Sequence, residues 1–182
     1  MPRKLTDNNA MEYIDLYGAD RQPLGQTILR GQPLPPDTYR LVVHVCLFNT
    51  QGEMLIQQRH THKSIFPDLW DLSAGGQVSH GETSSVAAMR ETAEELGLHL
   101  PIADMRPKLT IHFEDGFDDI YLLSTDITIN DLRLQQEEVH AVRFADENTI
   151  LQMIQEGRFI PYHEAYIRLL FTMRTKTGSF IR

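Results

Sequence analysis

Three carboxylates lie close together in one segment of the chain. Glu91, Glu94 and Glu95 are spaced so that their side chains share one face of an α-helix. Like charges at this spacing repel each other and destabilise an isolated helix. A hard divalent cation such as Mg²⁺ offsets that repulsion, because it prefers oxygen ligands and is often shared with substrate phosphates. The cluster is therefore either a solvated acidic face or a metal site for phosphate chemistry.

The helix that carries these carboxylates is predicted from Thr83 to Leu96, with Gly97 at the left-handed position that ends it. Four apolar side chains fall on the opposite side: Val86, Met89, Ala93 and Leu96. We expect that apolar side to pack on a sheet, and the acidic side to face outward or into a cleft. Arg90 flanks the acidic side, where it either orients a carboxylate or forms an ordinary surface ion pair.

The residues around the carboxylates reproduce a known motif. It comprises Gly76, Glu82, Arg90, Glu91, Glu94, Glu95, Gly97 and Leu98. In these residues and their spacing the chain resembles the Nudix hydrolases, whose box reads G, five residues, E, seven residues, then R-E-U-x-E-E-x-G-U, with U a bulky aliphatic residue. One position departs from the pattern, because Thr92 stands where an aliphatic residue is usual. We expect this change to affect packing and not metal binding.

The resemblance implies an α/β fold, a Nudix-type α/β/α sandwich with a mixed sheet, covering about residues 40–174. It also implies attack by water on a phosphorus, usually in a nucleoside diphosphate linked to another group. The partner is then a small phosphorylated metabolite and the cofactor Mg²⁺ or Mn²⁺. By the same resemblance Glu91 and Glu95 are metal ligands, and Glu94 is a third or acts through a water. The backbone carbonyl of Gly75 is a further candidate, and Glu82 supports the helix start or binds a water.

The general base is expected outside this motif. In the Nudix family it often precedes a late strand, and Glu137 and Glu138 directly precede the strand predicted at Val139–Phe144. A carboxylate there accepts the proton of an attacking water if it comes within hydrogen-bond reach; otherwise it is a solvated strand end. His140 is a weaker choice. Rival carboxylates lie in a segment predicted as an acidic turn, at Glu114, Asp115, Asp118 and Asp119.

Two other functions remain open. Residues 12–40 resemble, in layout, the strand-hairpin extension of isopentenyl-diphosphate-isomerase-like Nudix proteins. That isomerase needs a cysteine acid soon after the tryptophan of this segment and a metal-binding histidine two residues later, but the corresponding places after Trp70 hold Gly75 and Gln77. A ligand-binding sensor on the same fold is the second alternative. Such sensors commonly lose the metal carboxylates, which this chain keeps.

The composition limits the cellular setting and the partners. The chain has 182 residues, 41% of them hydrophobic, which fits one domain over 1–182 with 1–39 as an N-terminal strand and hairpin extension. A formal net charge of −8 disfavours binding to a nucleic acid polymer or an anionic membrane. We expect no secretory signal, no transmembrane helix and a cytoplasmic enzyme, in which the single Cys46 is a buried thiol. A homodimer is possible because two-fold dimers are common.

The remaining elements follow from apolar patterning and turn residues. Strands are expected at 12–17, 22–29, 40–48, 53–59, 108–113, 120–124 and 139–144, with an extended segment at 66–74. Asp146 is expected to cap a helix that ends near Gly157. Pro161 suits the first turn of a last helix, with one face formed by Tyr166, Leu169, Leu170 and Met173. The segment Arg59–Lys63 is either a phosphate contact or a solvated loop.

Overall fold

A seven-stranded mixed sheet forms the centre of the computed structural model, which describes residues 12–180. The strands are β3 (Arg40–Phe48), β4 (Met54–Arg59), β5 (Trp70–Asp71), β6 (Ala74–Gln77), β7 (Leu109–Phe113), β8 (Gly116–Ser124) and β9 (Val139–Ala145). Their order is β5-β4-β3-β8-β7, with β6 paired to β3 and β9 to β4. Strands β3 and β8 run parallel and the other pairs are antiparallel, so the sheet is mixed as predicted.

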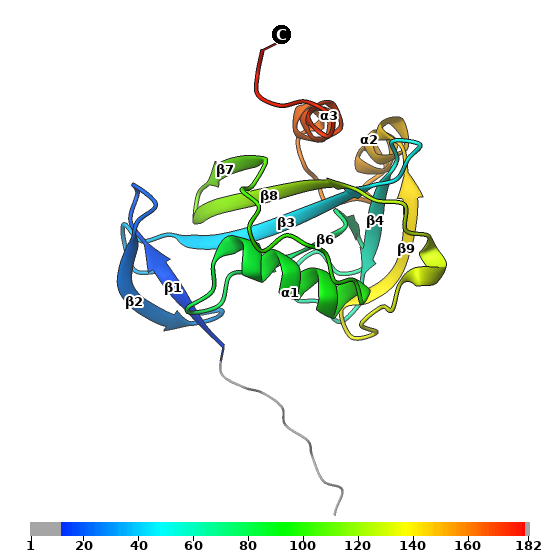
Figure 1. Ribbon diagram of the computed structural model, residues 1–182. Coiled ribbons are helices and arrows are strands. Elements are labelled where there is room, and N and C mark those ends of the chain that lie inside the picture. The colour runs from blue at the N-terminus through cyan, green and yellow to red at the C-terminus, as the bar shows by residue number, and fades with distance from the viewer. Residues whose placement is uncertain (1–11, 181–182) are drawn as a thin grey trace, which may run out of the picture.

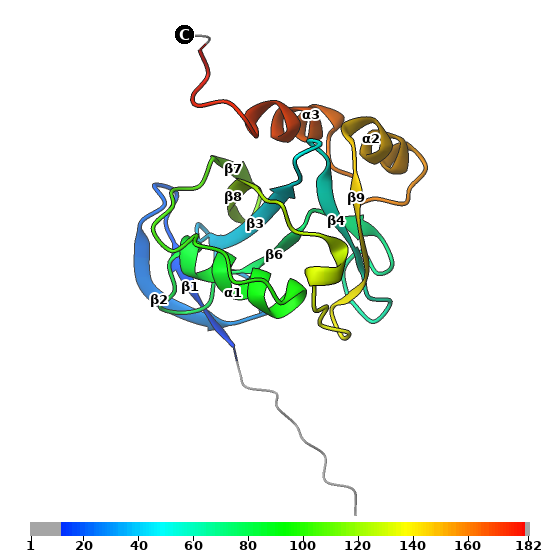
Figure 2. The ribbon, with the colours of Figure 1, turned by 45° about the vertical axis from the view of Figure 1, so that its right-hand side comes forward.

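Helices cover both faces of this sheet (Figures 1 and 2). Helix α1 (Ser84–Leu96) lies on one face, and α2 (Glu147–Gln155) and α3 (Glu164–Met173) lie on the other. Alternation along β3 divides the core, because Val43 and Val45 pack on the α1 side whereas Cys46 and Phe48 pack on the α2–α3 side. The predicted α/β/α sandwich is confirmed. Cys46 is a free and fully buried thiol.

The N-terminal hairpin consists of β1 (Tyr13–Tyr17) and β2 (Pro23–Leu29), which form a two-stranded antiparallel sheet of their own. It joins the main sheet through a bridge between Tyr17 and Tyr39 and through an ion pair from Arg21, in its turn, to the buried Asp119. The extension predicted at 1–39 thus includes this hairpin, while residues 1–11 lie outside the described part.

The start of one C-terminal helix agrees with the prediction from its capping residue, and the start of the other does not. Asp146 caps α2 as predicted, since its side chain accepts a 2.8 Å hydrogen bond from the amide of Thr149. The last helix, however, begins at Glu164 and not at Pro161, because Ile160 still donates to the carbonyl of Trp70 at 2.8 Å and the chain stays extended.

The face predicted for this last helix is correct only in part. Leu170 is buried and Tyr166 packs against the same core, as predicted. Leu169 is 38% exposed, and the other buried side chains are Ile167 and Phe171. Among the helices of residues 12–180, none is long and apolar enough to cross a bilayer.

Candidate metal and catalytic site

The ends of α1 are fixed by local hydrogen bonds. The Thr83 side chain accepts a bond from the amide of Val86 at the N-terminus. At the other end Gly97 has φ of 70°, a left-handed conformation, and its amide donates to carbonyls of the last turn. The helix therefore occupies the predicted segment and follows β6 after a short loop.

The face that α1 turns toward the sheet is only partly the predicted one. Leu96 is buried and Met89 packs on the same core, as predicted. Val86, however, is 42% exposed, whereas Glu91, Thr92 and Glu95 are buried. The prediction of an apolar face opposite all three carboxylates is therefore wrong for Val86 and for two of the carboxylates. Two carboxylates point into the protein, against β4 and β6, and only Glu94 stays in solvent. Thr92 is fully buried and its hydroxyl donates to the Ala88 carbonyl at 2.6 Å, so this departure from the family pattern lies in the packing.

Glu95 is a buried carboxylate supported by neutral donors. Gln57 on β4 donates through Nε2 at 3.0 Å, and the amide of Gly75 donates at 3.2 Å, both to Oε2. Burial, together with the nearby charge of Glu91, raises the pKa of Glu95 to about 8. At neutral pH without a cation the carboxyl is thus mostly protonated.

Two glycines of β6 make room for this arrangement. A Cβ atom on Gly76 would lie 2.0 Å from Oε1 of Glu91, so only glycine fits beneath that carboxylate. A Cβ atom on Gly75 would lie 2.6 Å from Cδ2 of His44, on the neighbouring strand. The Gly-Gly pair therefore brings the backbone of β6 into direct contact with the carboxylates of α1.

Arg90 connects the other carboxylates. Its guanidinium donates to both oxygens of Glu82 at 2.9 Å, to Glu91 at 2.8 Å and to the exposed Glu94 at 3.2 Å. A further bond reaches the carbonyl of Gln77 at 3.1 Å. Burial raises the pKa of Glu91 in spite of Arg90, whereas at Glu82 the bonds from Arg90 and Ser79 outweigh burial and lower the pKa. Arg90 is therefore an orienting residue with its donors occupied.

The donor set of this site consists of carboxylate oxygens and backbone carbonyls. Within residues 12–180 no three His, Cys, Asp or Glu side chains already converge as a metal cluster. Two carboxylates, Glu91 and Glu95, are nevertheless buried with raised pKa values, and the charge of Glu91 contributes to the shift at Glu95. Among residues 12–180, Glu95 has no cationic hydrogen-bond partner. These oxygens fit a hard divalent cation, which would favour their charged forms.

Glu138 lies just before β9 and forms an ion pair with Lys63, from the loop that follows β4. The backbone supports this contact, because the amide of His60 donates to the Glu138 carbonyl at 2.9 Å. The charge of Lys63 also acts on Glu95 and lowers its pKa slightly against the effect of burial. Glu137 is exposed, so of the two predicted bases Glu138 is the one joined to the site.

The predicted acidic turn does not exist as one unit. Strand β8 starts at Gly116, which leaves only Glu114 and Asp115 between β7 and β8. Asp118 bonds His44 on one face of the sheet. Asp119 is fully buried on the other face, bonded to Arg21 and to Thr110. Because alternate strand residues point to opposite faces, Asp118 and Asp119 are separated, and only Glu114 and Asp115 of the predicted set lie in the turn.

A second polar cluster, missed from the sequence, lies on the α3 side of the sheet. It comprises His44, Asp118, Tyr162, Asp71 and Arg59. The Nδ1 atom of His44 lies 2.8 Å from Asp118, and Tyr162 donates to Asp71 at 2.9 Å. Burial alone would lower the pKa of His44, but the charge and hydrogen bond of Asp118 outweigh it and raise the pKa to about 9. The only sequence signal was a histidine within an apolar strand.

Three histidines gather near the base. The rings of His60 and His62 are stacked with centroids 4.7 Å apart, and His140 meets His60 edge-on at 6.1 Å. His140 follows Glu138 by two positions on β9 and is exposed. It forms no hydrogen bond with a carboxylate of residues 12–180. The structure thus brings part of the predicted segment Arg59–Lys63 beside Glu138.

Comparison with known proteins agrees with this geometry. Residues 38–182 match the family NUDIX domain. An uncharacterized Nudix hydrolase of Listeria monocytogenes is 42% identical over 167 residues, which are 92% of this chain and 98% of the relative. Nudix hydrolase 3 of Arabidopsis thaliana is 31% identical over 84% of this chain and 22% of its own length. A crystal structure from Deinococcus radiodurans superposes with a TM-score of 0.72 at 26% identity, covering 89% of this chain and 99% of that one.

Proposed function

The chain belongs to the Nudix hydrolase family, and we propose that it cleaves a phosphoanhydride bond in a nucleoside diphosphate derivative or a similar small phosphorylated metabolite. One observation carries this proposal. Glu91 and Glu95 are buried side by side on α1, against a Gly-Gly backbone that leaves no room for another side chain. Glu91 is paired with Arg90, whereas Glu95 is bonded only by the neutral Gln57 and the amide of Gly75. Burying a carboxylate without a matching charge is costly, and a divalent cation shared with substrate phosphates would supply that charge.

The cofactor proposed is Mg²⁺ or Mn²⁺. Glu91 and Glu95 would hold it, with the carbonyl of Gly75 and the exposed Glu94, directly or through a water, as further ligands. When bound, such an ion polarises a phosphoryl oxygen and makes water a better nucleophile. Arg90 fixes Glu91 and Glu94 through the bonds described above, and Glu82 holds Arg90 in place.

Glu138 is proposed as the general base. Its carboxylate is partly exposed and held by an ion pair with Lys63, where it can accept the proton of the attacking water. The buried Asp119 is unsuitable, since Arg21 and Thr110 occupy its oxygens.

Lys63 is the basic side chain near the site that is best placed to bind a substrate phosphate, as the partners of its neighbours show. Arg90 is saturated by acidic partners. Arg59 belongs to the second polar cluster, where it donates to the carbonyl of Ile65 and pairs with Asp71. Lys63 has three donors and one carboxylate partner, which leaves two donors for a substrate phosphate. We therefore propose that Lys63 contacts a phosphate oxygen beside Glu95.

The isomerase alternative meets a steric obstacle. Its cysteine acid would stand at position 75, where a Cβ atom would lie 2.6 Å from His44 and 2.8 Å from the Val43 carbonyl. A sensor and a hydrolase would both bind the ligand, so only a measurement of cleavage distinguishes the sensor alternative from the proposed function.

The deciding experiment measures phosphate-containing products from a panel of nucleoside diphosphate derivatives, dinucleotides and isoprenoid diphosphates, with Mg²⁺ or with EDTA. Glu95→Gln should reduce metal-dependent turnover by about a hundredfold or more. The variant should still unfold in one cooperative thermal transition, which shows that the fold is retained. Glu164→Gln on α3, on the other face of the sheet, is the matched control and should turn over normally. Tight ligand binding without cleavage of any compound would favour the sensor, and unchanged turnover in Glu95→Gln would refute the ligand assignment.

A further inference from the structure

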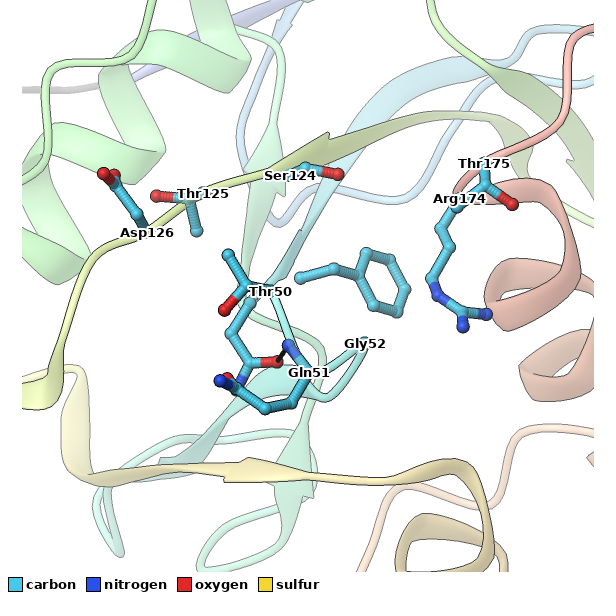
Figure 3. A pocket seen from close by; sticks show the side chains of 10 residues that line it. Thr50, Gln51, Gly52, Ser124, Thr125, Asp126, Arg174 and Thr175 are labelled. Atoms are coloured by element: carbon cyan, nitrogen blue, oxygen red, sulfur yellow. Dashed lines mark hydrogen bonds between the residues drawn. The ribbon is translucent and has the colours of Figure 1, made fainter.

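A hollow of about 500 Å³ opens at the ends of β3 and β8 (Figure 3). It is lined by Phe48 and the β3–β4 turn at 49–52, by 124–126 at the end of β8, and by Arg174 and Thr175 after α3. The carboxylate site lies beside His44 and Gly75, and Asn49 is five residues further along the chain from His44, about 17 Å in extended conformation. The hollow is therefore separate from the proposed catalytic site.

Arg174 provides the positive charge of this hollow. Its guanidinium packs over the rings of Phe48 and Phe171, at 5.9 Å and 5.8 Å from their centroids. Nη1 donates to the Phe171 carbonyl, but within residues 12–180 no carboxylate forms an ion pair with Arg174. Arg168 on the same helix, in contrast, pairs with Glu147 and Glu164. Arg174 is thus held in place by aromatic rings and a carbonyl, with its charge left available.

The turn at Gly52 keeps this guanidinium beside the hollow. Gly52 has φ of 80°, and a Cβ atom there would lie 3.0 Å from Nη2 of Arg174. Nε and Nη2 are the guanidinium atoms nearest to this turn, and no hydrogen bond joins them to another residue of 12–180. Guanidinium groups bind carboxylate and phosphate oxygens through two parallel hydrogen bonds.

Hydroxyl groups add further donors. Thr50, Ser124 and Thr175 line the hollow, and in the described part of the chain their hydroxyls have no protein partner. Thr125 accepts a 3.2 Å bond from the amide of Ile127, which leaves its own proton free to donate. The lining is therefore rich in donors around Arg174.

One acceptor lies across the hollow from this cation. Asp126 lines the opposite end and does not pair with Arg174 (Figure 3). A ligand that spans both would carry an oxyanion at one end and a hydroxyl or amino group at the other. The volume is within the range of sites for small metabolites, about 300–1,000 Å³, and exceeds the needs of a single ion.

We propose that this hollow is a second ligand site, which binds a small metabolite through an oxyanion group on Arg174 and a hydrogen-bond donor group on Asp126. The oxyanion is a phosphate monoester or a carboxylate, since a guanidinium binds both in the same geometry. The site does not depend on hydrolysis, and turnover should not change when Arg174 is replaced.

The test is a titration of the ¹⁵N-labelled full-length protein in EDTA, followed by amide chemical shifts. Inorganic phosphate and sodium acetate are the two probes, and the tighter one identifies the oxyanion. Saturable shifts are expected at Gly52, Thr125 and Thr175. In Arg174→Gln the affinity of the tighter probe should fall about tenfold or more, whereas Arg168→Gln should bind as the unmodified chain does.

Three outcomes would overturn the proposal: no saturable shift at these amides with either probe, shifts confined to Gly75 and Gly76, or equal affinity in Arg174→Gln. Because Arg174 also packs on two rings, its replacement could disturb the fold. The combined Thr50→Val and Ser124→Ala variant avoids this, since both side chains are exposed and unbonded. It should weaken the tighter probe several-fold, and unchanged affinity there would equally refute the site.

Discussion

Gln57 and Glu95 face each other across the junction of β4 and α1, with Nε2 of the amide 3.0 Å from the carboxylate. The donor is neutral, and the carboxylate is 7% exposed. An arginine in this place would stabilise the negative charge permanently. An amide orients the carboxylate without neutralising it, so the charged form is left to be stabilised by a cation that binds reversibly. The protonation of Glu95 should therefore change the free energy of unfolding with pH, which stability measurements can detect.

In the absence of metal, Glu95 should make the folded state less stable as pH rises. Its folded pKa is about 8 against an ordinary value of 4.5, so between these values the folded chain holds a proton that the unfolded chain has released. The free energy of unfolding therefore falls with rising pH across that window, and is unaffected by this group below it or above it. Urea unfolding in EDTA at roughly pH 5 to 9 measures the slope.

Glu95→Gln provides the comparison, because an amide of the same shape does not titrate. The variant should lose less stability than the unmodified chain between pH 4.5 and pH 8. His44, with a pKa raised to about 9, also loses its stabilising charge as pH rises. Asp118 is the main cause that raises this pKa and Glu95 the smallest, so most of the His44 contribution is common to both proteins. Identical pH slopes would show that Glu95 titrates normally.

Arg21 and Asp119 should anchor the N-terminal hairpin to the sheet. Asp119 is fully buried, so Arg21→Ala leaves a buried charge without its partner. We expect a loss of about 3 kcal/mol in the free energy of unfolding, near the low end for such pairs because Arg21 is partly exposed. Chemical denaturation of the single variant and of Arg21→Ala with Asp119→Asn measures it. The double variant should recover much of the loss, and a single variant as stable as the starting protein would contradict the anchoring role.

Local signals in the sequence located elements well. Gly97 ends α1 and Asp146 starts α2 as predicted, because caps depend on neighbouring residues only. The carboxylate cluster and Arg90 were also found from their spacing. The predicted start of α3 at Pro161 was wrong. Ile160 pairs with Trp70, which keeps the chain extended past Pro161, and this contact joins residues far apart in sequence.

The prediction of which face of α1 is buried failed in part, because two charged residues of the candidate site lie on the buried face. Hydrophobic patterning assumes that apolar residues are buried, and here Glu91 and Glu95 are buried while Val86 is exposed. His44 was missed because its partner Asp118 lies 74 positions away, joined only by the parallel pairing of β3 and β8. No periodicity within one strand reports such a contact.

Glu138→Gln should lower kcat more than it changes KM, since the proton acceptor is lost while substrate binding is retained. Glu137→Gln is the matched control, because it is adjacent and exposed. Steady-state kinetics on the substrate found in the panel measures both constants. If Glu137→Gln had the larger effect on kcat, the base would be misassigned between the two; if neither changed kcat, the base would lie on another element.

Lys63→Gln should raise KM by about tenfold, because a charged hydrogen bond to a substrate phosphate is lost. Lys63 also forms an ion pair with Glu138, so without it the proposed base should be held less firmly and kcat should fall as well. Lys63→Arg restores the charge and should recover both effects in part. Lys108→Gln controls for net charge. A change of KM with no change of kcat would leave Lys63 as a phosphate contact separate from the base, and no change in either would remove it from the site.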